Sequence, residues 1–195
     1  PETGKHIPAM KDIPFFANQV KIALRNCGVV DFASMESYIA NGGFTAIAKA
    51  LGMERADVVE EMKASGLRGR GGAGFPTGVK WEAGFKQQAE QKYIVCNADE
   101  GDPGAFMDRS VLESDPFGLI EGMMIAGYAI GAKNGYFYVR AEYPVAVNRL
   151  RIAIKQAEAL GLLGDRILGT DFSFRVNINR GAGAFVCGEE TALLN

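Results

Sequence analysis

The chain has 195 residues, of which 48% are hydrophobic and 23% are charged, a composition typical of a globular protein with a sizeable core. The formal net charge of −2 at pH 7 argues against nucleic acid as a partner, because no broad basic face is expected. The cysteines Cys27, Cys96 and Cys187 are too far apart in the sequence to predict a disulfide framework or an iron–sulfur site, and we interpret them as buried thiols in a reducing cytoplasm.

Residues 1–65 are expected to form a small N-terminal helical segment. Helices are expected over residues 15–26, 35–40, 44–51 and 56–65. Ser34 is placed to cap the second of these helices, and Gly66 is placed to end the fourth. The single histidine, His6, lies in an extended stretch before the first helix and indicates neither a catalytic triad nor a metal site.

Strands and helices alternate in the rest of the chain. The expected strands lie at 93–96, 136–139 and 172–179. One helix is expected to begin at Pro116 with Asp115 as its cap, a second to run from Pro144 to about residue 160 and end at Gly161, and a third to begin near Glu189. The most apolar stretch, residues 118–131, is interrupted by Glu121 and is shorter than the roughly 20 residues that span a bilayer, so we expect a buried helix and no membrane insertion. The alternation predicts an α/β domain over residues 66–195, with a three-layer open sheet and helices on both faces.

A glycine-rich stretch opens this domain. The stretch from Gly66 to Gly78 contains six glycines, counting both ends, with Arg68, Arg70 and Lys80 among or just after them. Glycines let backbone N–H groups surround an anion, and the nearby cations favour a phosphate. The G-x-G-x-x-G pattern of residues 69–74 lacks the preceding strand of a dinucleotide fingerprint, and Val79 breaks the P-loop pattern of an ATPase. A flexible surface loop is the alternative.

Polar residues follow the expected first strand, namely Asn97, Asp99, Glu100 and Asp102. Because ligands of open α/β sheets bind at the carboxyl ends of the strands, these side chains are candidates to accept hydrogen bonds from ring N–H groups, ribose hydroxyls or a carboxamide. A solvated turn is the alternative, and a metal site is less favoured because histidine is lacking.

A second glycine-rich loop follows the expected third strand, and its last carboxylates, Glu189 and Glu190, start a helix. Such carboxylates are stabilised by the helix dipole, which explains them without a ligand. The aromatic residues Phe75 and Phe185 each lie in a glycine-rich loop, where they are candidates to stack on a flat ring, although core packing is the commoner role of phenylalanine.

These motifs together resemble a known family. They comprise Gly66–Trp81, Cys96–Arg109 and Gly181–Leu193. In this order they resemble the NADH-oxidising FMN flavoprotein subunit of respiratory complex I and its relatives in soluble NAD(P)-linked, electron-bifurcating hydrogenases and formate dehydrogenases. The chain is similar to the N-terminal FMN/NADH domain of that family. The resemblance implies FMN at the sheet edge, NADH or NADPH as substrate, and a helical domain with a four-iron cluster beyond residue 195.

The resemblance also assigns roles to individual residues. It places the flavin near Gly69, Arg70, Gly71, Gly72, Gly74, Lys80, Asn97, Asp99, Glu100, Phe185, Gly188 and Glu189. It places the nicotinamide nucleotide near Phe75, Asp102 and Glu190, with Phe75 stacked on the adenine. Asp102 and Phe185 stand where complex I has glutamate and tyrosine, which favours the hydrogenase-type branch.

The implied function is transfer of hydride from NAD(P)H to FMN, with electrons then passed to iron–sulfur clusters in partner subunits of a larger complex. A complex I flavoprotein subunit and a formate dehydrogenase subunit are the alternatives within the family. A non-catalytic fragment that binds FMN or assists assembly is the alternative of another class.

Overall fold

A computed structural model of the chain describes residue 4 and residues 9–194. His6 lies outside these residues. The helices are α1 (Pro14–Ala17), α2 (Met35–Ala40), α3 (Thr45–Leu51), α4 (Arg55–Ala64), α5 (Thr77–Lys86), α6 (Met107–Ser114), α7 (Pro116–Ile130), α8 (Pro144–Ala159) and α9 (Glu190–Leu193). The strands are β1 (Tyr93–Ala98), β2 (Asn134–Val139) and β3 (Arg175–Arg180), and the 3-10 helices are η1 (Met10–Asp12), η2 (Ile167–Gly169) and η3 (Phe185–Gly188).

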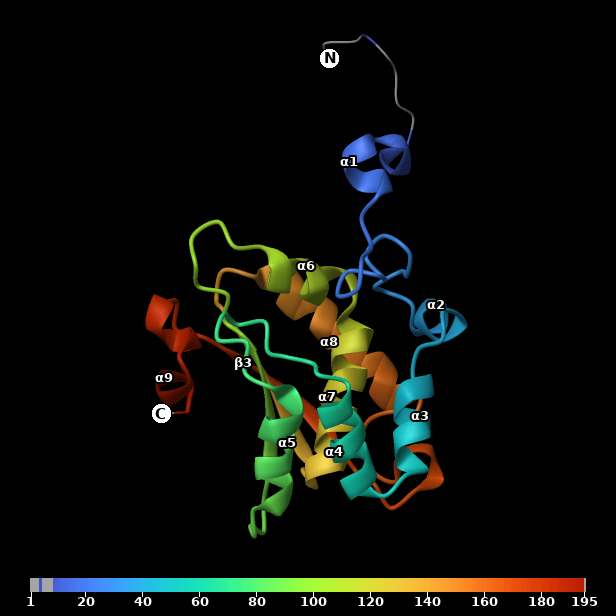
Figure 1. Ribbon diagram of the computed structural model, residues 1–195, viewed down its shortest axis with the longest axis vertical. Helices are drawn as coiled ribbons and strands as arrows, with labels where there is room; N and C mark the ends of the chain where they lie inside the picture. The colour runs from blue at the N-terminus through green and yellow to red at the C-terminus, as the bar shows by residue number, and fades with distance from the viewer. Residues whose placement is uncertain (1–3, 5–8, 195) are drawn as a thin grey trace.

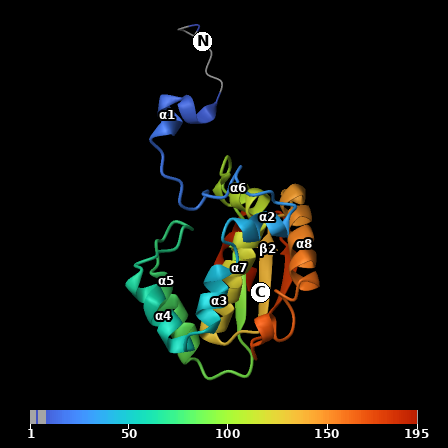
Figure 2. The same ribbon diagram turned by 90° about the vertical axis from the view of Figure 1, so that its right-hand side faces the viewer.

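The three strands form an open parallel sheet in the order β1-β2-β3. This sheet confirms the predicted α/β class. Because crossovers between parallel strands are right-handed, strands that follow in chain order receive their helices on one side. Accordingly α7 and α8 pack on one face, against residues such as Cys96 and Phe137 (Figures 1 and 2). Among the described residues the opposite face, with Tyr93 and Val95, is partly exposed rather than covered by a helical layer.

Helix α7 is the centre of the hydrophobic core. Phe117, Ile120 and Met124 on this helix are fully buried, and α7 contacts α3, α4, α5, α6 and α8 as well as β1 and β2. Asp115 caps the helix as the sequence predicts, by accepting a hydrogen bond from the backbone N–H of Gly118 at 3.0 Å. The stretch is therefore a buried helix, as predicted. No helix in the described part of the chain has the length and hydropathy needed to cross a membrane.

Glu121 is the one charged residue buried within α7. Its carboxylate accepts hydrogen bonds from the hydroxyl of Tyr38 at 2.6 Å and from the backbone N–H of Phe44 at 2.9 Å. It also accepts the N–H groups of Ala46 and Ile47, each at 3.0 Å. Phe44 is the N-cap of α3 and has no side-chain acceptor, so Glu121 supplies the acceptor that the helix start needs. Burial and the hydrogen bond to Glu121 raise the pKa of the Tyr38 hydroxyl.

Alanine substitutions at two glycines of α7 are expected to change the free energy of unfolding in opposite directions. A Cβ on Gly127 would lie 2.5 Å from the buried ring of Phe174, whereas a Cβ on Gly122 would meet nothing within 4 Å. We expect Gly127→Ala to lower the free energy of unfolding by about 1–3 kcal/mol through overpacking. Gly122→Ala should raise it by about 0.5–1 kcal/mol, because alanine loses less backbone entropy in a helix. Urea unfolding of the two variants measures this; equal midpoints would contradict it.

The N-terminal arm differs from the sequence prediction. In place of a helix over 15–26, only α1 is helical, and turns follow it. The helix buries no residue, Phe15 is 73% exposed, and the arm projects away from the body (Figures 1 and 2). A helix this short needs a packing surface to persist, so helical spacing alone did not determine its length. The helices α2, α3 and α4 were predicted correctly, apart from one or two residues at their ends. The domain boundary at residue 65 stays a prediction.

Later elements also differ in detail. The helix α5 begins at Thr77, inside the stretch expected to be a loop, and α6 was not predicted. The third strand begins at Arg175, because the chain before it turns back in a bridge between Gly164 and Phe174. Phe172 and Phe174 are buried in the core, as their alternation indicates, but they precede the strand.

Candidate functional site

The acidic segment, residues 97–102, lies at the carboxyl end of β1 and meets the second glycine-rich loop. The Asn97 side-chain amide donates a hydrogen bond to the carbonyl oxygen of Gly188 at 2.7 Å. Phe185, which is 69% exposed, lies against Gly101, where a Cβ would come within 3.2 Å of its ring. The structure therefore brings the acidic segment and the second glycine-rich loop together. The hydrogen-bonded residues, Asn97 and Gly188, lie 91 positions apart in the sequence.

Asp99 lies beneath this junction. It is 8% exposed, and its Oδ1 atom is buried without a hydrogen-bond partner among the described residues. A Cβ on Gly181 would lie 2.8 Å from that oxygen, and a Cβ on Gly188 would lie 2.7 Å from the Asp99 carbonyl oxygen. Burial raises the pKa of Asp99, an effect that the nearby Arg140 opposes. Two glycines thus allow the close approach of a buried carboxyl group that has an unused acceptor.

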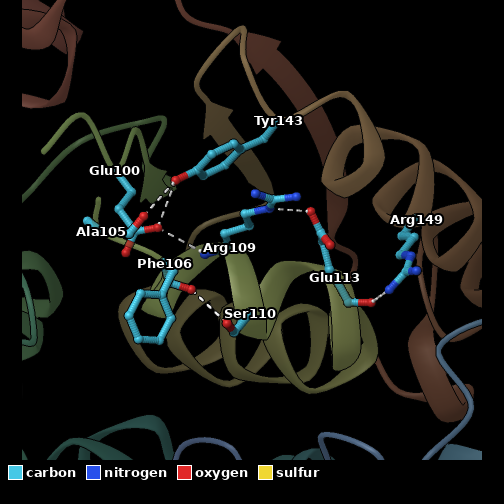
Figure 3. A network of polar contacts seen from close by, with 8 residues as sticks. All are labelled: Glu100, Ala105, Phe106, Arg109, Ser110, Glu113, Tyr143 and Arg149. Carbon is cyan, nitrogen blue, oxygen red and sulfur yellow. Dashed lines mark hydrogen bonds and ion pairs between the residues drawn. The ribbon is translucent and has the colours of Figure 1, made fainter. Parts of the chain in front are cut away.

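The Glu100 carboxylate contacts the start of α6 and the loop after β2. One carboxylate oxygen accepts the backbone N–H of Asp108 at 3.0 Å. The other accepts the backbone N–H of Arg109 at 3.2 Å (Figure 3). The hydroxyl of Tyr143 also donates to this carboxylate, at 3.0 Å. Both oxygens are therefore used by the chain itself. Asp102, by contrast, lies in an exposed turn, where its carbonyl oxygen accepts the N–H of Ala105.

The first glycine-rich loop is closed at its base. The N–H of Gly69 donates to the carbonyl oxygen of Phe75 at 2.8 Å, and the N–H of Thr77 donates to Leu67 at 2.9 Å. Gly72 and Gly74 have φ values of 108° and 61°, which favour glycine. The loop is thus a defined excursion, with Gly71 and Arg70 at its exposed part and the half-exposed Phe75 at its end.

Lys80 and Glu190 connect the two glycine-rich loops. Lys80 lies in the first turns of α5, and its Nζ atom is 2.9 Å from a carboxylate oxygen of Glu190, at the start of α9. Both side chains are mostly exposed, so the pair adds little to stability. The neighbouring Glu189 caps α9 by accepting the N–H of Thr191, and hydrogen bonds to Thr191 lower its pKa.

Two cavities flank the end of β1, and Asn97 lines both. The first, of about 480 Å³, is also lined by Arg70, Cys96 and Asp108. The second, of about 450 Å³, is also lined by Lys80, Trp81 and Glu190. Both volumes lie in the range of small-molecule sites. Burial raises the pKa of the Cys96 thiol to about 12. Because the thiolate is the reactive form, Cys96 lines the cavity as a neutral thiol and is a poor nucleophile.

The structure therefore gathers most of the predicted site residues at one edge of the sheet. It adds Arg140 and Tyr143, from the loop after β2; the sequence indicates a polar loop there but no individual role for either residue. The signal for them is positional, because this loop lies at the same sheet edge as the acidic segment. No group of three or more histidine, cysteine, aspartate or glutamate residues in the described ranges is arranged to hold a metal ion.

Comparison with known proteins decides the family. The family model described as the Nuo51 FMN-binding domain matches residues 62–195. The chain belongs to this FMN-binding domain family. The prediction from the three motifs is thereby confirmed.

Relatives within the family are closely similar. The NADP-reducing hydrogenase subunit HndC of Solidesulfovibrio fructosivorans is 58% identical over 176 residues, which cover 90% of this chain and 36% of the relative. An NADH-quinone oxidoreductase subunit of Rhizobium meliloti (strain 1021) is 52% identical over 174 residues, which cover 89% of this chain and 41% of the relative. The chain thus spans well under half the length of these relatives.

A solved structure shows the same fold. A chain in the crystal structure of the NAD+-reducing NiFe-hydrogenase in the air-oxidized state matches with a TM-score of 0.67 and 32% sequence identity. The match covers 90% of this chain and 27% of the hydrogenase chain. The fold of this chain is therefore similar to that of part of an NAD+-reducing hydrogenase chain.

Proposed function

We propose that the chain forms the FMN- and NAD(P)H-binding part of an oxidoreductase subunit that transfers hydride from the nicotinamide nucleotide to FMN. The observation that carries this proposal is the buried, unpartnered oxygen of Asp99, at a junction where Gly181 and Gly188 leave no room for side chains. Buried polar atoms in proteins nearly always have a hydrogen-bond partner, so this oxygen suits a ligand donor such as the ring N–H of a flavin.

The residues at the sheet edge fit the cofactor chemically. Asn97 and Asp99 offer an amide and a carboxyl group for the flavin ring and ribityl chain. The backbone of residues 69–74 and the ammonium group of Lys80 suit anionic groups. Of the predicted flavin contacts, Phe185 and Gly188 lie in the second glycine-rich loop. Glu189 follows them as the N-cap of α9.

The predicted nucleotide contacts are more exposed. Phe75 offers an aromatic face for the adenine, and Asp102 and Glu190 offer carboxylates for ribose hydroxyls or the carboxamide. Glu190 is available for this role only when it leaves Lys80, and a mostly exposed ion pair separates at little cost. Glu100 is engaged with α6, so we propose that it acts on the site indirectly.

When bound, FMN supplies the hydride acceptor of the reaction. The protein residues contribute orientation, because hydride transfer requires the two rings to lie in contact. Asp99 and Asn97 would hold the flavin, and Phe75 would hold the adenine of the nucleotide. The cation of Lys80 would offset negative charge that develops on the reduced ring.

The names of the relatives support a multisubunit assembly. Both a hydrogenase subunit and quinone oxidoreductase subunits match the chain. We propose a cytoplasmic NAD(P)-linked complex of the hydrogenase type, in which iron–sulfur partner subunits receive the electrons. The first of these relatives is named for NADP and the others for NADH, so the proposal covers both nucleotides.

Anaerobic titration tests the function directly. We expect the full-length gene product, reconstituted with FMN and freed of excess cofactor, to retain a flavin spectrum that NADH or NADPH bleaches. Retained flavin that neither nucleotide bleaches would instead support a non-catalytic binding or assembly role. Failure to retain FMN would contradict the proposal altogether.

A further inference from the structure

The loop after β2, residues 140–143, holds the acidic segment in place through two side chains. A guanidinium nitrogen of Arg140 donates a hydrogen bond to the carbonyl oxygen of Glu100. The hydroxyl of Tyr143 donates to the Glu100 carboxylate at 3.0 Å and lies 3.4 Å from the carbonyl oxygen of Ala105 (Figure 3). One residue of the acidic segment is thus held both by its backbone and by its side chain.

Arg140 is itself fixed. Its Nε and Nη2 atoms donate to the two carboxylate oxygens of Glu142, at 3.2 and 3.1 Å. Its guanidinium carbon lies 5.2 Å from the centre of the Tyr143 ring, within the range of a cation–π contact. This planar group therefore makes directed contacts to three partners, which the ammonium group of a lysine does not reproduce.

Tyr143 connects this loop to α6. The ring is 7% exposed, and the Arg109 guanidinium carbon lies 5.6 Å from its centre. The Glu100 carboxylate that accepts the Tyr143 hydroxyl also accepts the N–H groups of Asp108 and Arg109. These are the second and third residues of α6, whose N-cap, Phe106, makes no side-chain hydrogen bond. Glu100 thus replaces the missing cap.

The segment between these contacts carries the predicted ligand residues. Asp99 comes directly before Glu100, and Asp102 lies between Glu100 and the start of α6. The intervening residues are mostly exposed, and Gly104 has a φ of 83°, so this turn has few contacts of its own. Its shape is therefore set by its two ends.

We propose that Arg140 and Tyr143 are positioning residues, which hold residues 99–106 in the shape that presents Asp99 and Asp102 to the flavin and the nicotinamide nucleotide. The ligand half of this inference rests on the proposed function, whereas the ordering of the segment does not. The hydroxyl of Tyr143 is the contact that can be removed most selectively. Its loss leaves the ring, its two cation contacts and the hydrophobic packing in place.

Hydrogen–deuterium exchange tests the ordering of the segment without any ligand. In the full-length gene product, we expect Tyr143→Phe to speed exchange about tenfold at the Asp108 and Arg109 amides, because Glu100 then loses a charge-assisted contact. Arg140→Lys should have the same effect. Tyr136→Phe is the matched control, since this tyrosine lies on the partly exposed face of β2 and contacts the ring of Tyr93. The control should leave these amides unchanged.

Binding of FMN and of NADH to the same variants tests the positioning role. We expect Tyr143→Phe to weaken at least one of these affinities about tenfold, while the melting temperature stays within a few degrees of the wild type. Weakened binding that only parallels a large fall in melting temperature would reduce the role to stability and contradict the inference. Unchanged exchange and unchanged affinities would also overturn it.

The two measurements separate this inference from the proposed function. A wild-type protein that fails to bind FMN contradicts the proposed function and the ligand half of the inference. Exchange at residues 99–109 then still decides whether Arg140 and Tyr143 order the segment. A wild-type protein that binds FMN, with variants that bind it equally well, contradicts the positioning role alone.

Discussion

Glu121→Ala is expected to lower the free energy of unfolding by about 3–5 kcal/mol, because it leaves buried donors without an acceptor. The carboxylate accepts the Tyr38 hydroxyl and three backbone N–H groups around the start of α3. Glu121 lies on α7 and is only 4% exposed, with its carboxylate against the start of α3. Chemical denaturation of the variant and the wild type measures the difference.

A graded control accompanies this variant. Tyr38→Phe removes one of the donors and leaves the carboxylate bound to the helix start, so we expect a loss of only about 1–2 kcal/mol. The order of the two variants is the test. If Glu121→Ala were no less stable than Tyr38→Phe, the carboxylate would not be the anchor of α3.

FMN affinity is expected to fall about 10- to 100-fold in the Gly188→Ala variant. The added Cβ would lie 2.7 Å from the carbonyl oxygen of Asp99, so the second glycine-rich loop must move away from the acidic segment. The same shift would strain the hydrogen bond from Asn97 to the Gly188 carbonyl oxygen, which is 2.7 Å long. Quenching of flavin fluorescence on binding gives the dissociation constants.

Gly52→Ala is the matched control for this change. Gly52 lies in the turn between α3 and α4, at ordinary van der Waals distance from its neighbours and away from the sheet edge. FMN affinity should be unchanged in this variant. Wild-type affinity in Gly188→Ala would show that the two loops need not lie in contact to bind the cofactor.

Local chemistry made much of the fold predictable from sequence. Ser34 and Asp115 cap α2 and α7, and Gly66 and Gly161 follow the ends of α4 and α8 with positive φ values. These signals work because a cap bonds to residues only two or three positions away. Apolar spacing likewise identified the buried strands, and the order of the three motifs identified the family.

The spacing of apolar residues did not predict the secondary structure correctly where a segment needs contacts with distant parts of the chain. The predicted helix over residues 15–26 fails because its apolar residues have no core to cover in the structure. The gathering of the glycine-rich loops and the acidic segment at one edge was predictable, because parallel strands place their carboxyl ends together. The individual contacts of each carboxylate were not.

The sequence by itself determined the α/β class and the family, and it predicted a set of candidate cofactor-binding residues. Only the tertiary structure decided which carboxylates are free to use. Phe44 and Phe106 begin helices without a capping side chain, and Glu121 and Glu100 supply the acceptors from elsewhere. Glu121 lies 74 positions from Ile47, a separation that no local pattern reports. The N–H groups of a helix start need acceptors wherever the chain can bring them, so folding assigned Glu100 to α6. It left the Oδ1 atom of Asp99 without a partner among the described residues.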